Sequence, residues 1–332
     1  MDRERQRLEW ARNALADPAA GIERASTDAG FRSYWRTTGE TPRIVMDSPP
    51  ELEDVRPWLR MQRVLADGGV RVPGVLREDA EAGFLLLEDL GSRTFLHDLD
   101  EHNADALFEG AIGQLLKLQA IEPPADLPHY DEAMLARELR LFDDWFCTTH
   151  LGLVLDCGAM DTLDGAYRYL IDAALAQPRV LVHRDFMPRN LMQAEAGPAV
   201  LDFQDAVLGP IAYDPLSLFK DAFLSWPAER VDGWLRAYHA RAQAAGLPVP
   251  ALERFLHDAE LIGVQRHLKV IGIFARLHHR DAKPKYLEDV PRFFAYLDEV
   301  LPRHARLSGL HDFIRERVAP AMAARAAAHP PA

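Results

Sequence analysis

The spacing of apolar residues changes near residue 90, and the change predicts two regions of different architecture. Before this point, short apolar runs alternate with turn residues, which is typical of strands. The runs are FRSYW, RIVM, VRVPGVL and GFLLLED. Two stretches depart from this pattern and predict helices: residues 3–16 and Leu52–Leu65, where apolar positions recur at helical spacing. The first 90 residues are therefore predicted to form a strand-rich lobe.

Beyond this point the spacing is mostly helical. The predicted helices cover 104–120, 131–149, 160–176, 213–225, 229–245, 251–277, 285–301 and 308–327. One strand pair interrupts them, NLMQ at 190–193 and AVLDF at 199–203, joined by the turn-like AEAGP. The pattern predicts an α+β protein with a small β-rich lobe, 1–90, and a large helical lobe, 91–332. The hinge is expected near Glu88–Gly91.

Composition and charge restrict the classes of protein that this chain can represent. The chain has 332 residues, of which 48% are apolar and 27% charged, as in soluble globular proteins. A net charge of −13 disfavours a nucleic-acid partner, whose phosphates call for a basic face. A small anionic substrate remains compatible with it, because a local site can be basic on an acidic protein. Nothing in the sequence indicates a protein partner.

The two cysteines and the first residues point to the cytoplasm. Cys147 and Cys157 form no CxxC pair, so they predict no structural zinc site, and two cysteines suit a reducing compartment. The start, MDRERQRLEWARNAL, is too charged for a signal peptide. No apolar run approaches the roughly 18–20 residues that span a bilayer. We therefore expect a cytoplasmic protein without a membrane partner.

The stretch HRDFMPRN, residues 183–190, fits the pattern H-x-D-x-x-x-x-N, and Asp202 follows twelve residues after Asn190. ATP-dependent phosphoryl transfer needs these groups: a carboxylate that takes the acceptor's proton, and two oxygen ligands for Mg²⁺. The predicted hairpin would bring Asn190 and Asp202 to one edge. Asp185 would then be the base. The alternative is that Asp185 and Asn190 form turns and Asp202 caps a strand.

The chain resembles the aminoglycoside phosphotransferase and choline kinase-like superfamily, relatives of the protein kinases. Within it, the chain is most similar to the bacterial N-acetylmuramate/N-acetylglucosamine anomeric kinases of cell-wall, or peptidoglycan, recycling. The residues that carry the resemblance are DAGFRSYWR (28–36), IVMDSPPELEDVRPW (44–58), GFLLLEDLG (83–91), LVHRDFMPRNLM (181–192), LDFQDAVLGPIAYDPLSLFKD (201–221) and QRHLKVIGIFARL (265–277). The H-x-D-x-x-x-x-N element is shared across the superfamily, whereas DFQDA, MDSPPE and QRHLKVIGIFARL are narrower.

The resemblance implies a two-lobed protein-kinase-like fold that binds ATP and Mg²⁺. It implies Asp185 as the catalytic base, and Asn190 and Asp202 as the Mg²⁺ ligands. The backbone of Glu88–Leu90 would bind adenine. The segment Ser26–Ser33 would cover the phosphates, with the hydroxyls of Ser26, Thr27 and Ser33 and a lone Gly30 in place of a glycine-rich loop.

One position departs from the protein-kinase pattern. The strand that should carry the phosphate-pairing lysine reads RIVMD, and Met46 stands in the lysine's place. We expect Arg32, Arg36 or Arg43 to substitute for it, and Arg43 is included among the expected nucleotide-binding residues. The alternative for each arginine is a solvated strand position.

Three residues are candidates for the acceptor side. Asp205 could accept a hydrogen bond from a sugar hydroxyl, and Arg189 could bind a phosphate or a substrate anion. Arg266 could meet the carboxylate of a muramic acid, because that acceptor is an anion. The alternatives are an ion pair for Arg189 and a surface charge for Arg266.

The expected activity is ATP-dependent phosphorylation of the anomeric (C1) hydroxyl of N-acetylmuramate, N-acetylglucosamine or both. A first alternative is a kinase of the same superfamily with another acceptor, such as an aminoglycoside, a choline-like amine or another sugar. A second is an inactive nucleotide-binding scaffold, suggested by Met46. The presence of Asp185, Asn190 and Asp202 together argues against that scaffold.

Overall fold

A computed structural model describes residues 2–27, 31–195 and 197–328. The chain forms two compact units that interleave in sequence. Unit 1 comprises residues 1–121 and 188–206, and unit 2 comprises residues 122–187 and 207–332. The division of the chain into lobes at residue 90 stays a prediction.

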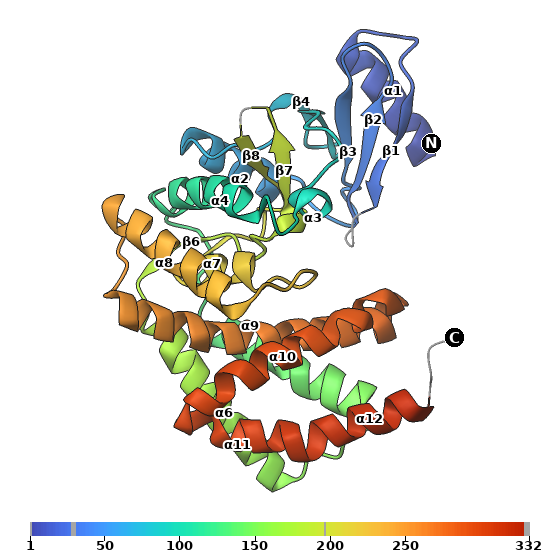
Figure 1. Ribbon diagram of the computed structural model, residues 1–332. Coiled ribbons are helices and arrows are strands. Elements are labelled where there is room, and N and C mark those ends of the chain that lie inside the picture. Colours follow the sequence, from blue (N-terminus) through green and yellow to red (C-terminus); the bar gives the residue numbers. More distant parts are fainter. Residues whose placement is uncertain (1, 28–30, 196, 329–332) are drawn as a thin grey trace. The chain divides into compact units, whose positions relative to one another are not determined.

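Unit 1 is built on a five-stranded antiparallel sheet (Figure 1). Its strands, in spatial order, are β1 (Ile22–Thr27), β2 (Ser33–Thr37), β3 (Arg43–Asp47), β5 (Phe84–Glu88) and β4 (Val75–Asp79). The strands predicted from FRSYW, RIVM and GFLLLED are confirmed. Side chains alternate between the two faces of a strand, so Ile44 and Met46 of β3 share one face. Met46 pairs with Tyr34 on β2 and with Leu85 on β5.

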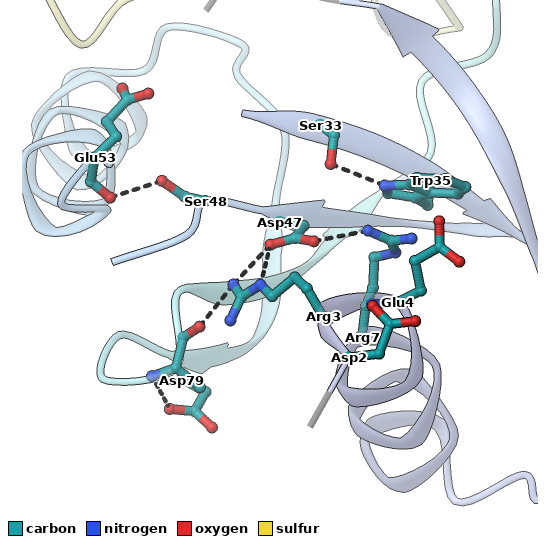
Figure 2. Close-up of polar contacts among 11 residues, drawn as sticks. Asp2, Arg3, Glu4, Arg7, Ser33, Trp35, Asp47, Ser48, Glu53 and Asp79 are labelled. Atoms are coloured by element: carbon teal, nitrogen blue, oxygen red, sulfur yellow. Dashed lines mark hydrogen bonds and ion pairs between the residues drawn. The ribbon is translucent and has the colours of Figure 1, made fainter. Parts of the chain in front are cut away.

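Four helices complete this part of unit 1: α1 (Arg3–Leu15), α2 (Arg56–Asp67), α3 (Phe95–Asp98) and α4 (Ala104–Gln119). Helix α1 is tied to the end of β3 through Asp47, which is almost fully buried. Arg3 donates to Oδ1 of Asp47 at 2.6 Å and Arg7 donates to Oδ2 at 2.8 Å (Figure 2). A buried carboxylate is tolerated when cations and hydrogen bonds satisfy it, so these arginines fix β3 next to Met46.

The motif region returns to unit 1 as a short 3-10 turn, η2 (Pro188–Asn190), followed by a hairpin of β7 (Leu191–Ala194) and β8 (Gly197–Val200). The strands pair from Leu191↔Val200 to Ala194↔Gly197. The Leu201 N–H also donates to the Asn190 carbonyl at 2.9 Å. The predicted hairpin is therefore confirmed, and it brings the chain at Asn190 beside the chain just before Asp202.

Unit 2 is helical. Its helices are α5 (Glu132–Leu141), η1 (Phe142–His150), α6 (Cys157–Leu175), α7 (Tyr213–Phe219), α8 (Ala228–Ala244), α9 (Leu252–Asp281), η3 (Pro284–Asp289), α10 (Val290–Val300), η4 (Leu301–Arg303), η5 (Ala305–Leu307), α11 (Ser308–Phe313), η6 (Ile314–Val318) and α12 (Ala319–Ala328). The long α9 packs against η1, α5, α6 and α10 (Figure 1). Its residues from Leu261 to Gly272 are all buried, so α9 forms the centre of the unit 2 core.

Two details of unit 2 differ from the expectation. The helix expected over 213–225 ends at Phe219, because Asp221 then accepts the N–H groups of Phe223 and Leu224 in a turn. A strand pair was also missed. β6 (Arg179–Val182) pairs antiparallel with β9 (Val207–Pro210), and their partners lie too far apart in the chain for a local signal.

Among the described residues, no helix combines the length and the apolar character that crossing a membrane requires.

Candidate nucleotide and catalytic site

Unit 1 contains a cavity of about 430 Å³, within the range typical of small-molecule sites. Its walls come from β1–β3, β5, the segment after β5, η2, β7 and the chain after β8. The apolar lining residues are Ala25, Ile44, Trp58, Pro73, Leu87, Leu90, Met192, Leu201 and Phe203. Ile44 and Leu87 are neighbours across β3 and β5. These apolar walls suit a flat aromatic base such as adenine.

One end of the cavity is formed by the chain that leaves β5. Glu88, Leu90 and Gly91 line it, as expected for the segment that meets adenine. The Glu88 N–H already donates to the Gly74 carbonyl at 2.8 Å, so a contact of the Glu88 backbone with a base would use its carbonyl. The Glu88 carboxylate is bound by Arg71, which lowers the pKa of Glu88 although burial opposes this.

Arg36 fixes this same turn. It donates to both carboxylate oxygens of Asp89, at 2.6 and 2.9 Å, and to the Gly91 carbonyl at 2.9 Å. The Gly91 N–H in turn donates to Asp89. Burial would raise the pKa of Asp89, but the Arg36 guanidinium outweighs it and the pKa lies below its usual range. Arg36 is therefore a structural lock on the turn after β5.

The polar residues that line the cavity include Arg189, Asn190 and Asp202. Asn190 is buried at the end of η2. Asp202 has a φ of 62°, a left-handed conformation that aspartate adopts more readily than most residues. Gln204 donates to Oδ1 of Asp202 at 2.9 Å and to Asp205 at 3.3 Å. Carboxylate and amide oxygens are the ligands that Mg²⁺ prefers, so Asn190 and Asp202 fit this ion.

A second group of potential metal ligands lies in unit 2. The imidazole nitrogens of His150, His278 and His279 lie within 4.8 Å of one another. Nitrogen donors suit zinc or copper and not Mg²⁺. These histidines are therefore separate from the oxygen ligands expected for a nucleotide site.

Arg32 is not among the described residues that line the cavity, but it contacts Asp202, which is. Its Nη2 lies 3.4 Å from Oδ1 of Asp202, and its Nε lies 3.6 Å from Oε1 of Glu53. Only 6% of the Arg32 side chain is exposed. A cation thus lies between a carboxylate at the start of the α2 region and the candidate metal ligand.

The segment expected to cover the phosphates is described only in part. Ser26 lines the cavity. Gly30 and the side chain of Thr27 lie outside the described part of the chain. The Ser33 hydroxyl accepts a hydrogen bond from the Trp35 indole at 2.9 Å (Figure 2). In the described part of the chain, Arg43 is not among the residues that line the cavity, and its guanidinium donates to the Pro42 carbonyl.

Asp185 lies in unit 2, in the loop after β6, and it is partly exposed. Asp214 of α7 holds this loop by accepting the N–H groups of His183, at 2.7 Å, and Arg184, at 3.0 Å. The Asp185 N–H lies 3.2 Å from Nδ1 of His183. Complete burial raises the pKa of Asp214 to about 6, although His183 and the two N–H donors oppose this. The hydrogen bonds of Asp214 and His183 thus fix the backbone that presents Asp185.

A buried ionic cluster supports the loop from the other side. Arg184 donates to Oε1 of Glu138 at 2.6 Å, and Lys269 of α9 reaches the same oxygen at 2.9 Å. Tyr130 donates to Oε2 of Glu138, and Gln265 donates to it at 3.2 Å. Burial would raise the pKa of Glu138, but Lys269 and Arg184 lower it to about 2.

Two candidates for the acceptor side have different surroundings. Asp205 lies in unit 1, beside Gln204. Arg266 lies in unit 2 and is only 1% exposed, with Asp221 close enough to interact electrostatically. The alternative that Arg266 is a surface charge is therefore wrong.

Sequence reasoning missed the roles of Asp89, Asp214 and Glu138. Asp89 carried no local signal, because its partner Arg36 lies 53 positions away in the chain. Glu138 carried none, since its partners at 184 and 269 are distant in the chain.

Comparison with known proteins shows a family and a fold. Residues 21–255 match the model of the phosphotransferase enzyme family. An N-acetylmuramate/N-acetylglucosamine kinase of Pseudomonas putida is 52% identical over 92% of this chain and 91% of its own. A protein of the same name from Neisseria meningitidis is 41% identical over 96% of this chain and 97% of its own.

The similar solved structures are more distant in sequence. The choline kinase LicA from Streptococcus pneumoniae has a TM-score of 0.63 at 14% identity, over 90% of this chain and all of its own. The ADP-bound aminoglycoside phosphotransferase APH(2'')-Ib has a TM-score of 0.60 at 15% identity, over 88% of this chain and 97% of its own. The expected kinase-like α+β fold is confirmed.

Proposed function

The chain belongs to the phosphotransferase enzyme family, and we propose that it transfers the γ-phosphoryl group of ATP to the anomeric hydroxyl of N-acetylmuramate, N-acetylglucosamine or both. It is an ATP-dependent kinase, and its relatives are named as kinases. The observation that carries the choice of acceptor is the 52% identity with a kinase of these two sugars, over 92% of the chain. We place the reaction in the cytoplasm, where ATP is available, as a step of peptidoglycan recycling.

The residues support this chemistry in three ways. The cavity of unit 1 offers apolar walls for adenine and polar lining residues that include Arg189, Asn190 and Asp202. The fixed loop of unit 2 presents a carboxylate, Asp185, that can accept a proton. Phosphoryl transfer asks a protein mainly to position the reactants and to neutralise charge.

In the proposed reaction, the anomeric oxygen forms a bond to the γ-phosphorus and the bond to the bridging β–γ oxygen breaks. ADP leaves with that electron pair. Asp185 accepts the proton of the anomeric hydroxyl, as a general base. Asn190 and Asp202 would hold Mg²⁺, which supplies positive charge to the phosphates. Glu88 and Leu90 would bind adenine, and Ser26 would lie over the phosphates.

On the acceptor side, Asp205 is proposed to accept a sugar hydroxyl and Arg189 to contact a phosphate or an acceptor anion. Arg266 stays a candidate for the lactyl carboxylate of N-acetylmuramate. Its near-complete burial means that an acceptor must enter the core of unit 2 to reach it.

The test is an acceptor panel. The purified protein is given Mg-ATP with N-acetylmuramate, N-acetylglucosamine, glucose, choline or kanamycin, and ADP release is followed while phosphorus NMR identifies the product. A sugar 1-phosphate from the N-acetylated sugars alone is the expected result. Phosphorylated kanamycin or choline would overturn the acceptor and leave the kinase reaction standing. If none of the five compounds causes ADP release, the proposed acceptors are contradicted.

A further inference from the structure

The position that carries a phosphate-binding lysine in kinases has no charge here. Ile44 of β3 lines the cavity, and Met46 lies two residues along the same face. Met46 has no exposed surface. In kinases a lysine assists the metal at the phosphates, so we expect another cation of this chain to supply that charge beside Arg189, which lines the cavity.

We infer that Arg32 is this cation and that Glu53 positions it. The inference rests on the proposed function, since it concerns the phosphates of the ATP that this reaction uses. Arg32 stands at the entry to β2 and approaches two carboxylates, Glu53 at 3.6 Å and Asp202 at 3.4 Å. The charge has thus moved from β3 to the start of the neighbouring strand.

The contact with Asp202 places Arg32 where the phosphates are expected. In this class of reaction, the metal held by such a carboxylate also binds the phosphate oxygens. A guanidinium 3.4 Å from Asp202 is therefore within reach of those oxygens. Arginine suits the role because its planar fork can bind two phosphate oxygens at once.

The two other candidates are engaged elsewhere. Arg36 makes two short contacts with Asp89, at 2.6 and 2.9 Å, and a third with the Gly91 carbonyl. These contacts hold Arg36 at the turn after β5, where adenine is expected to bind. Among the described residues, neither Arg43 nor Arg32 lines the cavity, but Arg32 contacts Asp202, which does. Of the three arginines, Arg32 is the one whose described contacts include Asp202, at 3.4 Å.

Glu53 is held in place by the end of β3. The Ser48 hydroxyl donates to the Glu53 carbonyl at 2.9 Å (Figure 2). Ser48 is fully buried, and its N–H donates to the Gly83 carbonyl. It directly follows Asp47, which Arg3 and Arg7 anchor. The residue that follows β3 therefore fixes the backbone at Glu53, whose carboxylate contacts Arg32.

The test is nucleotide binding without any sugar. A fluorescent trinitrophenyl-ATP is displaced by ATP, ADP or adenosine in the presence of Mg²⁺, for the wild type and for Arg32→Ala. Losing one charge-assisted contact to phosphate should weaken ATP and ADP about 10- to 100-fold. Adenosine carries no phosphate, so its affinity should stay within about twofold. A merely structural role for Arg32 would weaken adenosine to the same extent.

Further variants sharpen the comparison. Arg32→Lys keeps a point charge and should lose less than Arg32→Ala, which also guards against poor folding of the alanine variant. Glu53→Gln should weaken ATP more than adenosine, by a smaller factor than Arg32→Ala. Arg77→Ala is the matched control, because Arg77 is exposed on β4 and does not line the cavity.

Three results would overturn the inference: unchanged ATP affinity in Arg32→Ala, an equal loss for adenosine, or the phosphate-dependent loss occurring in Arg43→Ala instead. These binding measurements contain no acceptor, so they do not depend on whether the proposed acceptor sugars are correct. A wild type that binds ATP and phosphorylates none of the five compounds would leave the result for Arg32 intact.

Discussion

Arg184 donates from Nη2 to Oε1 of Glu138 at 2.6 Å, while its own backbone has a left-handed φ of 75°. A non-glycine residue in that conformation is sustained by its surroundings. The residue next to the proposed base is thus held by a buried carboxylate from α5, and the loop geometry depends on an ionic cluster outside the motif.

Glu138→Gln should be strongly destabilising. Removing the charge leaves Lys269 and Arg184 in the core without their shared anion, and breaking a buried pair costs about 3–5 kcal/mol. Urea unfolding at pH 7 measures this. Glu132→Gln is the control, because its pair with Arg168 is exposed and should contribute little to stability. Equal losses in the two variants would contradict a special role for the buried pair.

The effect of Glu138 should depend on pH with a definite sign. Its folded pKa of about 2 lies below the ordinary value of 4.5, so the unfolded chain binds this proton more tightly. The stabilisation is therefore complete above about pH 4.5 and is lost as the pH falls towards 2. Unfolding free energies of the wild type and Glu138→Gln should converge over this window. A difference that stays constant from pH 5 to pH 2.5 would disprove the assignment.

Asp185→Asn should remove the proposed base with little effect on folding. We expect kcat to fall by about 10²- to 10⁴-fold, the usual effect of losing a general base. The affinity for ATP and the melting temperature should stay close to those of the wild type. Asp161→Asn, at an exposed position of α6, is the control. Near-normal turnover in Asp185→Asn would show that another group takes the proton.

Asp202→Ala should abolish the response to Mg²⁺. The wild type should lose activity in EDTA and regain it as Mg²⁺ is added. The variant should show no saturable recovery, because one of two oxygen ligands is gone. Asp67→Ala, exposed at the end of α2, should behave like the wild type. Full recovery in Asp202→Ala would mean that the metal is held by other residues.

Arg36→Lys tests the lock on the turn after β5. An ammonium group cannot reproduce the paired contacts with Asp89 together with the one to Gly91. The expected result is a KM for ATP raised about 5- to 50-fold, as for one lost charge-assisted bond, with kcat nearly unchanged. Arg63→Lys, which alters an exposed pair with Glu78, is the comparison. Steady-state kinetics at varied ATP concentrations measure KM and kcat for both variants.

Elements formed by contiguous residues could be predicted from the sequence. The hairpin from Asn190 to Asp202 was predicted because strand and turn signals are contiguous, and the structure confirms it. The long-range partners were beyond reach. Arg32 and Asp202 are 170 positions apart, and three arginines near β2 and β3 were equivalent on sequence alone. Their difference comes from sheet register and from the turns that bring Glu53 and Asp89 to them.

The cavity also differs from kinase nucleotide sites in its reactivity. Among the described residues that line it there is no lysine, so no primary amine is present on its walls. Guanidinium groups stay protonated at any ordinary pH and are poor nucleophiles. Electrophilic nucleotide analogues designed to acylate a strand lysine should therefore leave this cavity unlabelled. Such reagents would report an inactive protein, although the proposed phosphate cation, Arg32, stands just before β2.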